Sequence, residues 1–230
     1  MKKLQFSLLT LSIFTSLSCL AQDKGEWDIR LRGIGAIPDA SATIGVIGGN
    51  VNITSAYVPE LDFTYFFAKN FSAELILGTT RHTVNTVGSD LTAIGGGSSA
   101  NIDLGKVSLL PPTLTLQYHI PTGSAFKPYI GAGINYTIFY DVNAGNTVSS
   151  LSYKNKFSFA TQAGFDVDVS KKVFINVDVK KLFLSTDVTV NAANLTPSGS
   201  PALAPVLAAI PAAVKINPWI IGLGVGYRIK

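Results

Sequence analysis

The stretch FSFATQAGFDVDV, residues 157–169, decides the fold. Apolar residues occupy its odd positions, with Thr161 as the exception, and small or polar residues occupy the even ones. A period of two is typical of a β-strand with one apolar face, whereas a helix repeats every 3.6 residues. The same alternation predicts strands over 27–32, 60–65, 113–119, 173–180 and 219–229, and segments near 71–84 and 128–140 complete a set of eight.

The composition points to a membrane protein that has no membrane-spanning helix. The 230 residues are 47% hydrophobic and only 14% charged, with a mean hydropathy of +0.34. Soluble domains average roughly 25% charged residues, and a helical span needs roughly 20 consecutive apolar residues. The high apolar and aromatic content argues against disorder. The net charge of +4 falls to +2 without Lys2 and Lys3, so we expect no nucleic-acid partner.

The N-terminus is predicted to be a secretory signal peptide, residues 1–21. Lys2 and Lys3 precede an apolar stretch over 4–17, and small residues at Cys19 and Ala21 suit signal peptidase. We therefore expect cleavage before Gln22, which leaves residues 22–230 as an exported barrel without cysteine. Lipidation at Cys19 is the alternative, although a lipobox would need leucine where Ser16 stands.

The connections between the predicted strands alternate between short and long. Short turns fall at 67–71, 120–128 and 169–173, and long loops at 38–52, 85–106, 141–156 and 184–216. This asymmetry predicts an all-β fold: an eight-stranded antiparallel up-and-down transmembrane β-barrel with short periplasmic turns and long extracellular loops. The expected location is the outer membrane of a Gram-negative bacterium, reached through the periplasm, and its lipid is the first expected partner.

A soluble barrel with an apolar interior would show the same alternation. The polar face distinguishes the two, because a surface in water is normally rich in lysine and glutamate. Here that face carries mainly Gly, Ser, Thr, Gln and Asn, which suit the crowded lumen of eight strands. The apolar face carries aromatic residues near strand ends, as a membrane girdle requires: Trp27, Phe63, Tyr65, Tyr118, Tyr136, Phe157, Trp219 and Tyr227.

Three ordered segments resemble the OmpW family of small outer-membrane channels, and the likeness covers essentially all of 22–230. They are LPPTLxxQY at 110–118, PYIGAGINYTxF at 128–139, and KINPW at 215–219 continuing to GVGYR at 224–228. His82 also falls where the family pattern has a histidine. The chain departs from the family at its end, Tyr227-Arg228-Ile229-Lys230, which lacks the usual terminal aromatic residue. The last strand still resembles a signal read by the barrel-insertion machinery, a second expected partner.

No pattern in the sequence indicates catalysis, a metal or a cofactor, and we expect none. His82 and His119 are predicted to point inward at opposite ends of the barrel, on the order of 35 Å apart, too far to share a metal. A single histidine could still join a serine and a carboxylate in a triad, but no motif marks one. The glycine run at 95–97 lacks the lysine of a phosphate loop. Residues 201–214 are apolar but interrupted by prolines, and we expect a short helix there over the barrel mouth.

The resemblance implies passive uptake of small hydrophobic molecules through an apolar lumen with a lateral exit into the membrane. Eight strands are too few for a porin-like aqueous channel. Apolar residues at the loop-side rim are candidates for lining the entrance, with loop packing or plugging as the alternative: Ile37, Ile53, Tyr57, Phe139 and Leu151. Charged residues of both signs fall at strand positions that should point inward, and they predict an ionic plug in the lower lumen: Arg30, Arg32, Glu60, Asp62, Glu74, Asp166, Asp168, Asp178 and Lys180.

A second function remains open from sequence alone. The loops at 85–106 and 184–216 are long enough to contact host, phage or colicin-like ligands. In that case the protein would be a structural or surface-interaction barrel that transports nothing.

Overall fold

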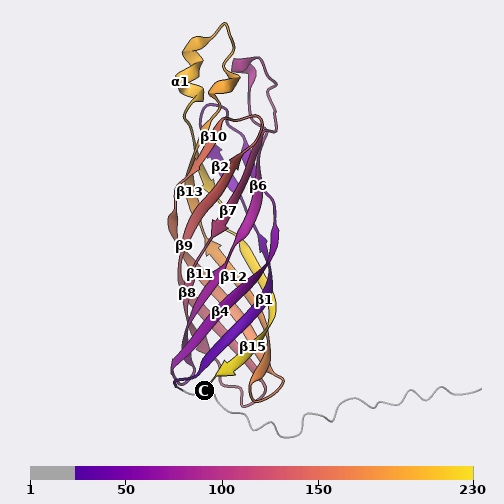
Figure 1. The fold of residues 1–230 in the computed structure, drawn as a ribbon, viewed down its shortest axis with the longest axis vertical. Coiled ribbons are helices and arrows are strands. Elements are labelled where there is room, and N and C mark those ends of the chain that lie inside the picture. The colour runs from indigo at the N-terminus through magenta and orange to yellow at the C-terminus, as the bar shows by residue number, and fades with distance from the viewer. Residues whose placement is uncertain (1–23, 230) are drawn as a thin grey trace, which may run out of the picture.

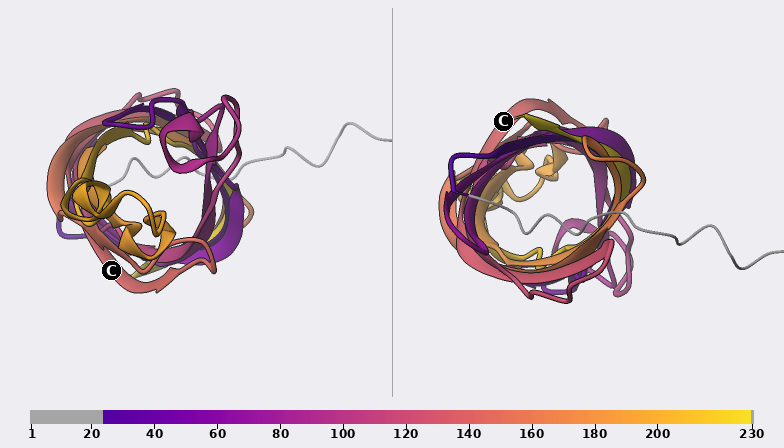
Figure 2. Two further views of the ribbon diagram at one scale, coloured as in Figure 1. Left: turned by 90° about the horizontal axis from the view of Figure 1, so that it is seen from above. Right: turned by 90° about the horizontal axis from the view of Figure 1, so that it is seen from below.

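Eight antiparallel strands close into a ring in the computed structural model, which describes residues 24–229 (Figures 1 and 2). The predicted eight-stranded barrel is therefore confirmed, while the predicted signal peptide lies outside the described residues. In order of pairing, the ring consists of β1 (Trp27–Ile37), β4 (Ala56–Ala68), β5 (Phe71–Gly78), β8 (Thr113–His119), β9 (Phe126–Ala144), β11 (Lys156–Asp168), β12 (Val173–Phe183) and β15 (Trp219–Ile229), which pairs with β1.

The outer face of this ring is apolar along its whole height. On β15 every second residue from Trp219 to Ile229 is a large exposed hydrophobic side chain. An eleven-residue strand rises roughly 3.3 Å per residue and tilts by about 40°, so it spans about 25 Å, the height of a lipid-facing band. Aromatic pairs such as Trp27 with Tyr65 and Tyr136 with Phe157 stand near the two borders of this band.

No helix in the described part of the chain is long and apolar enough to cross a membrane.

Tight packing inside the ring depends on glycine where strands approach closely. A Cβ atom on Gly133 of β9 would lie 2.0 Å from the carbonyl oxygen of Leu114 on β8. A Cβ on Gly226 of β15 would lie 2.1 Å from the ring of Phe174 on β12. Any larger residue at these two positions would push strands or rings apart.

Each of the predicted long loops contains strand segments, which extend the barrel upward beyond the ring. This upper extension contains β2 (Ser41–Ile44), β3 (Asn50–Ile53), β6 (Thr80–Val87), β7 (Asp103–Leu110), β10 (Ser150–Tyr153), β13 (Ser185–Asn191), β14 (Ile210–Lys215) and the upper end of β9. They form two sheets, β3-β6-β7-β9 and β10-β13-β14-β2.

The two sheets of the extension are separated by two seams. Within residues 24–229 no backbone ladder joins β2 to β3 or β9 to β10. Side chains bridge the second seam: the Phe139 N–H donates to Oδ1 of Asn155 (3.0 Å), and the Phe139 and Tyr153 rings stack at 5.2 Å. The first seam begins directly above the last β1–β4 pair, Ala36 with Ala56.

The strands are interrupted at the level where the ring meets the extension. Pro38, the pair Pro111-Pro112, and Pro218 all stand at this junction, where a missing N–H group ends a ladder. The Asp39 N–H bonds to the Ile216 carbonyl, and the Thr54 N–H bonds to the Thr83 carbonyl, both at 3.0 Å. The chain on either side of the first seam is therefore held to a different sheet.

Short helical turns cover the top of the extension (Figure 1). They are η1 (Thr92–Ile94), η2 (Ala193–Leu195), η3 (Pro201–Leu203) and α1 (Ala204–Leu207). The expected helix within 201–214 is present but only four residues long, because β14 begins at Ile210. Leu207 of α1 is buried and reaches down into the apolar interior.

Candidate functional site

The barrel interior changes from charged to apolar along its height, as the inward residues of β1 and β12 show. On β1 the inward residues are Arg30 and Arg32 in the lower part, then Ile34 and Ala36 above them. On β12 Asp178 and Lys180 are followed by Leu182. Alternation keeps these side chains on the inner face, so the change in polarity follows the sequence of both strands.

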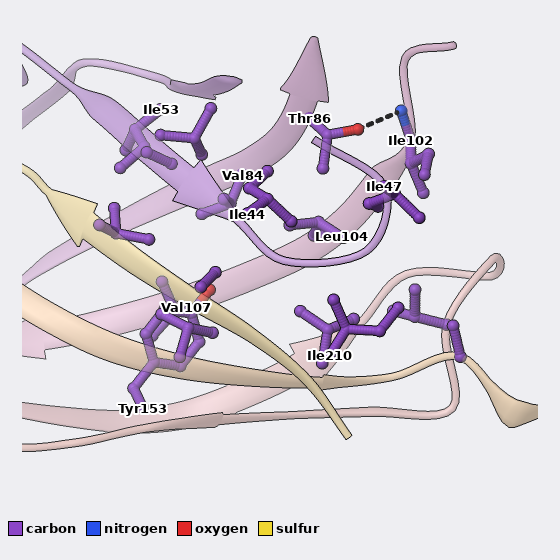
Figure 3. A pocket seen from close by; sticks show the side chains of 18 of the residues that line it. Ile44, Ile47, Ile53, Val84, Thr86, Ile102, Leu104, Val107, Tyr153 and Ile210 are labelled. Atoms are coloured by element: carbon purple, nitrogen blue, oxygen red, sulfur yellow. Dashed lines mark hydrogen bonds between the residues drawn. The ribbon is translucent and has the colours of Figure 1, made fainter. Parts of the chain in front are cut away.

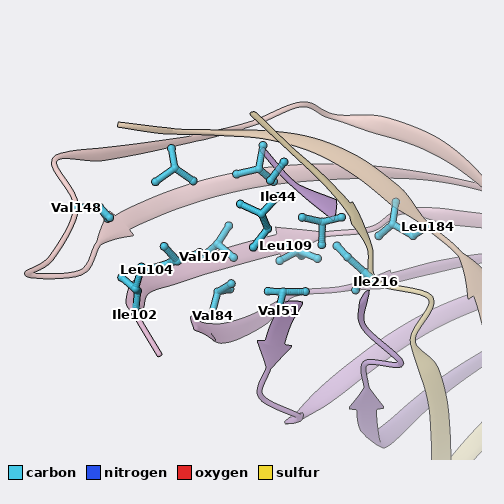
Figure 4. Packing of buried hydrophobic residues seen from close by; sticks show 14 of the residues in the cluster. Ile44, Val51, Val84, Ile102, Leu104, Val107, Leu109, Val148, Leu184 and Ile216 are labelled. Atoms are coloured by element: carbon cyan, nitrogen blue, oxygen red, sulfur yellow. The ribbon is translucent and has the colours of Figure 1, made fainter. Parts of the chain in front are cut away.

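An apolar cavity, which we call the upper cavity, fills the extension (Figure 3). Its outline takes in about 920 Å³ of space between the atoms, part of it open to solvent, and it is walled by aliphatic side chains from both sheets, among them Ile44, Val51, Val84, Leu104, Val107 and Ile210. These aliphatic side chains belong to one buried hydrophobic cluster, and Figure 4 shows members of it lying between the strands. Two of the polar residues of the wall already have partners: the Thr86 hydroxyl accepts a hydrogen bond from the Ile102 N–H at 3.1 Å, and the His82 ring lies 2.6 Å from the Thr54 carbonyl oxygen. This cavity suits an apolar guest that makes no hydrogen bonds.

A second cavity, the lower cavity, lies beneath the first, and its outline takes in about 610 Å³ of space between the atoms, part of it open to solvent. The two cavities share His82, Leu109 and Ile216 in their walls, so they lie end to end. His82 is held there, with Nδ1 2.6 Å from the Thr54 carbonyl oxygen and Nε2 2.9 Å from Oγ1 of Thr80. Both ring nitrogens therefore have partners, which favours a positioning role over catalysis.

Glu60 and Lys180 form the floor of the lower cavity, and their charged atoms lie 2.9 Å apart. They belong to a lumen ion network that lies below the cavities. Eight of the nine residues predicted to plug the lumen meet in it: Arg30, Arg32, Glu60, Asp62, Glu74, Asp166, Asp178 and Lys180.

The two arginines are the centre of the lumen ion network, and neither side chain is exposed. Arg30 Nε lies 2.7 Å from Oδ1 of Asp62, and Arg30 Nη2 lies 3.1 Å from Oε1 of Glu74. Arg32 Nη2 lies 2.7 Å from Asp62 and 3.0 Å from Glu74. Buried charges are tolerated when several partners compensate the lost hydration, and here each guanidinium faces at least three carboxylates.

Neutral side chains add hydrogen bonds to two of the carboxylates, Glu74 and Asp178. Gln117 and Gln162 each donate an amide hydrogen to Oε2 of Glu74 at 2.7 Å. The Tyr129 hydroxyl donates to Oδ2 of Asp178 at 2.8 Å. These three residues were missed as members of the site, although their even or odd positions already marked them as inward.

The ninth predicted residue, Asp168, lies apart from the other eight in a separate cluster at the lower end. Its carboxylate lies 2.8 Å from Lys127 Nζ and 3.3 Å from Arg228 Nη1. Arg228 also approaches Asp28 at 3.4 Å and Glu26 at 3.6 Å. Lys127 and Arg228 were not predicted, and the only signal for them is the inward parity of β9 and β15.

The five predicted entrance residues separate into two groups. Ile53 and Phe139 line the upper cavity, and Leu151 packs against the same hydrophobic cluster. Ile37 and Tyr57 line neither cavity, because their odd positions on β1 and β4 point outward and leave them 38% and 79% exposed. They lie instead on the lipid side of the first seam.

Comparisons with known proteins agree with this architecture. The sequence matches the OmpW family model over residues 23–229. It is 42% identical to an uncharacterized outer-membrane protein, y4mB, of Sinorhizobium fredii over 91% of this chain and 82% of that protein. It is 32% identical to outer membrane protein W of Escherichia coli over 99% of this chain and all of that protein.

Among solved structures, the fold is similar to outer membrane protein OprG of Pseudomonas aeruginosa. The TM-score is 0.75 at 28% identity, covering 91% of this chain and 98% of OprG. The resemblance seen in the motifs at 110–118, 128–139 and 215–228 is thus confirmed along the whole barrel, and the alternative of a soluble barrel is excluded. The chain belongs to the OmpW family and is a barrel protein of the outer membrane.

Proposed function

We propose that the protein takes up small hydrophobic molecules passively from the outside and releases them sideways into the membrane. The observation that supports this most strongly is the pair of stacked cavities, whose walls are mainly aliphatic. An apolar guest that enters from water gains free energy when it exchanges its hydration shell for these aliphatic walls. Neither step requires catalysis, so we propose a conduit and not an enzyme.

The lumen ion network closes the route downward in this proposal. Its buried charges are fixed by direct ion pairs such as Lys180 with Glu60 and Arg32 with Asp62. An apolar guest would have to displace these charges to continue, whereas the apolar wall ends just above them. A guest in the lower cavity is therefore driven to leave through the side.

The proposed exit is the first seam, above the β1–β4 ladder. Ala36 and Pro38 line the lower cavity at this height, and Ile37 and Tyr57 are exposed on the outside of the same strands. Because β2 and β3 follow different sheets, separating them breaks no backbone ladder in the described chain. The exposed Ile37 and Tyr57 would provide an apolar surface for a guest that moves into lipid.

A blocked lower cavity tests this route. Ala36→Trp places a large ring into the lower cavity, while Ala163→Trp adds the same ring to the lipid face of β11 as a matched control. The assay compares uptake of a labelled hydrocarbon by cells with no barrel, the parent, or either variant. We expect Ala36→Trp to reduce uptake to the level of cells without the barrel and Ala163→Trp to leave it unchanged.

Equal uptake in cells with and without the parent protein would contradict the proposal. If deleting 193–209 then abolished an adhesion or receptor phenotype, the surface-interaction function would replace it.

We also propose that β15 engages the barrel-insertion machinery during assembly. Every outward residue of β15, from Trp219 to Ile229, is a large apolar side chain. Binding of this strand would use backbone pairing plus the apolar side chains on one face.

A further inference from the structure

The outer surface of the extension has a polar groove that the proposed uptake does not use. This rim groove lies on the sheet β10-β13-β14-β2 and encloses about 700 Å³ of open space. The residues that give it its chemistry are Ser41, Thr43, Lys156, Ser185, Asp187 and Lys215. Three hydroxyls and two ammonium groups thus face one hollow.

The pairing of the strands fixes these side chains in rows. Lys215 of β14 is directly opposite Ser185 of β13 on one side and Ser41 of β2 on the other. The alternate residues Val214 and Thr186 are buried, so the groove residues point outward. The row of hydroxyl, ammonium and hydroxyl is therefore a property of the sheet and not of a mobile loop.

The rim groove carries an excess of positive charge. Asp187 is its carboxylate, and it lies 2.9 Å from Lys156 Nζ and 3.8 Å from Lys154 Nζ. The hydrogen bond and charge of Lys156 hold the pKa of Asp187 below its usual range, so it stays ionised at neutral pH. Lys215 has no ion-pair partner in the described chain, so the groove holds two ammonium groups and one carboxylate.

The height of the rim groove on the barrel indicates which part of the membrane it faces. Phe183 lies two residues before Ser185 on the same outward face, and Phe157 directly follows Lys156; their exposures are 53% and 75%. Lys181 Nζ lies 4.6 Å above the exposed ring of Trp219 at the same border. The groove therefore begins where the lipid-facing band ends, at the height of the outer-leaflet headgroups.

We propose that the rim groove binds the phosphorylated headgroup of an outer-leaflet lipid. The phosphate lies between Lys215 and Lys156, accepts hydrogen bonds from the serine and threonine hydroxyls, and leaves the acyl chains against the phenylalanines below. A phosphate oxygen is a stronger acceptor than neutral groups, and a lysine near a membrane surface contributes about fivefold to anionic-lipid binding. The bound lipid would fix the depth of the barrel in the membrane.

The test is a binding titration of the full-length protein in neutral detergent, followed by native mass spectrometry. The probes are bis-phosphorylated lipid A and the same lipid after complete removal of its phosphates. We expect the phosphorylated form to bind at least tenfold more tightly. Lys156→Gln with Lys215→Gln should weaken its binding about 25-fold, at roughly fivefold for each lysine.

Three further variants control for charge and folding. Lys156→Arg with Lys215→Arg should keep the affinity, and Asp187→Asn should increase it because a competing carboxylate is lost. Lys106→Gln with Lys172→Gln removes two exposed lysines away from the groove and should change nothing. Heat-modifiable migration on a denaturing gel confirms that each variant is a folded barrel.

Equal binding of the two lipid forms would overturn the proposal, as would an equal loss in the Lys106 and Lys172 control. Displacement of lipid A by an equal concentration of inorganic phosphate would overturn it too, because the groove would then bind a free anion and not a lipid.

Discussion

Arg30 of β1 and Asp62 of β4 are direct cross-strand partners, and their side chains meet at 2.7 Å with no exposure to solvent. Removing one member of a buried pair costs roughly 3–5 kcal/mol, because the remaining charge loses its compensation. We expect Asp62→Ala to lower the free energy of unfolding by about 3 kcal/mol, since Arg30 retains Glu74 at 3.1 Å. Urea titration in lipid vesicles, followed by tryptophan fluorescence, measures the change.

The exposed pair of Arg81 and Asp141 is the matched control, with side-chain exposures of 45% and 51%. Exposed ion pairs contribute little because water screens them. Arg81→Gln should therefore leave the unfolding midpoint almost unchanged. A shift as large as that of Asp62→Ala would mean that burial does not determine the importance of these pairs.

Opening the lumen ion network should create an ion pathway where the parent protein has none. Glu60→Ser with Lys180→Ser removes two opposite charges together, so the net charge of the network is preserved. We expect the parent to show no steady conductance in planar bilayers and the double variant to show small, discrete openings. Lys156→Ser with Asp187→Ser removes an exposed pair and should resemble the parent. A steady conductance of the parent itself would contradict the proposed plug.

The lower barrel could be predicted because one physical rule governs all of it. Lipid outside and a crowded lumen inside impose a period of two, so parity alone placed Arg30, Glu74 and Lys180 inside. However, whether a residue is at an odd or an even position does not determine its height along the barrel axis. The separation of Asp168 from the other eight charges depends on strand tilt and register, which pair it with Lys127 and Arg228.

The extension was harder to predict because its strands lack a lipid-facing side. Val188 and Val190 alternate with polar residues in β13, but only over seven positions. Pro211 and a run of alanines obscured the alternation in β14, where Ile210, Ala212 and Val214 point inward. Apolarity alone does not identify entrance residues at the rim: Tyr57 is apolar, but its odd position on β4 places it on the outer face.

Acid should weaken the ion pair of Asp141 with Arg81 in the extension. The Arg81 hydrogen bond holds the pKa of the Asp141 carboxyl below its ordinary 3.8. A lowered pKa in the folded state means that the pair stabilises the fold above pH 3.8 and that this contribution is lost as the pH falls further. NMR titration of the labelled carboxyl should give a value below 3.8 in the parent and one nearer 3.8 in Arg81→Gln. Identical titration curves would show that Arg81 does not set this pKa.

Close strand contact should make Gly133 intolerant of any side chain. In Gly133→Ala the new Cβ would meet the Leu114 carbonyl oxygen at 2.0 Å, and backbone cannot rotate away as a side chain does. We expect a loss of roughly 1–3 kcal/mol in the free energy of unfolding, the usual cost of overpacking. Gly33→Ala adds the same methyl group where nothing lies within 4 Å and should be nearly neutral. Equal stability of the two variants would contradict the close approach of β8 and β9.

Assembly should depend on the last strand more than on an equivalent girdle residue elsewhere. Tyr227 of β15 and Tyr65 of β4 are both outward aromatic side chains near the lower border of the barrel, although Tyr65 is half-buried against Trp27. If the insertion machinery binds β15, Tyr227→Ser should slow assisted assembly into vesicles several-fold while Tyr65→Ser changes it little. Unassisted refolding in detergent should slow by similar amounts in both, because lipid burial alone acts there. The fraction with heat-modifiable gel migration over time measures both rates, and equal slowing in the assisted reaction would contradict the role of β15.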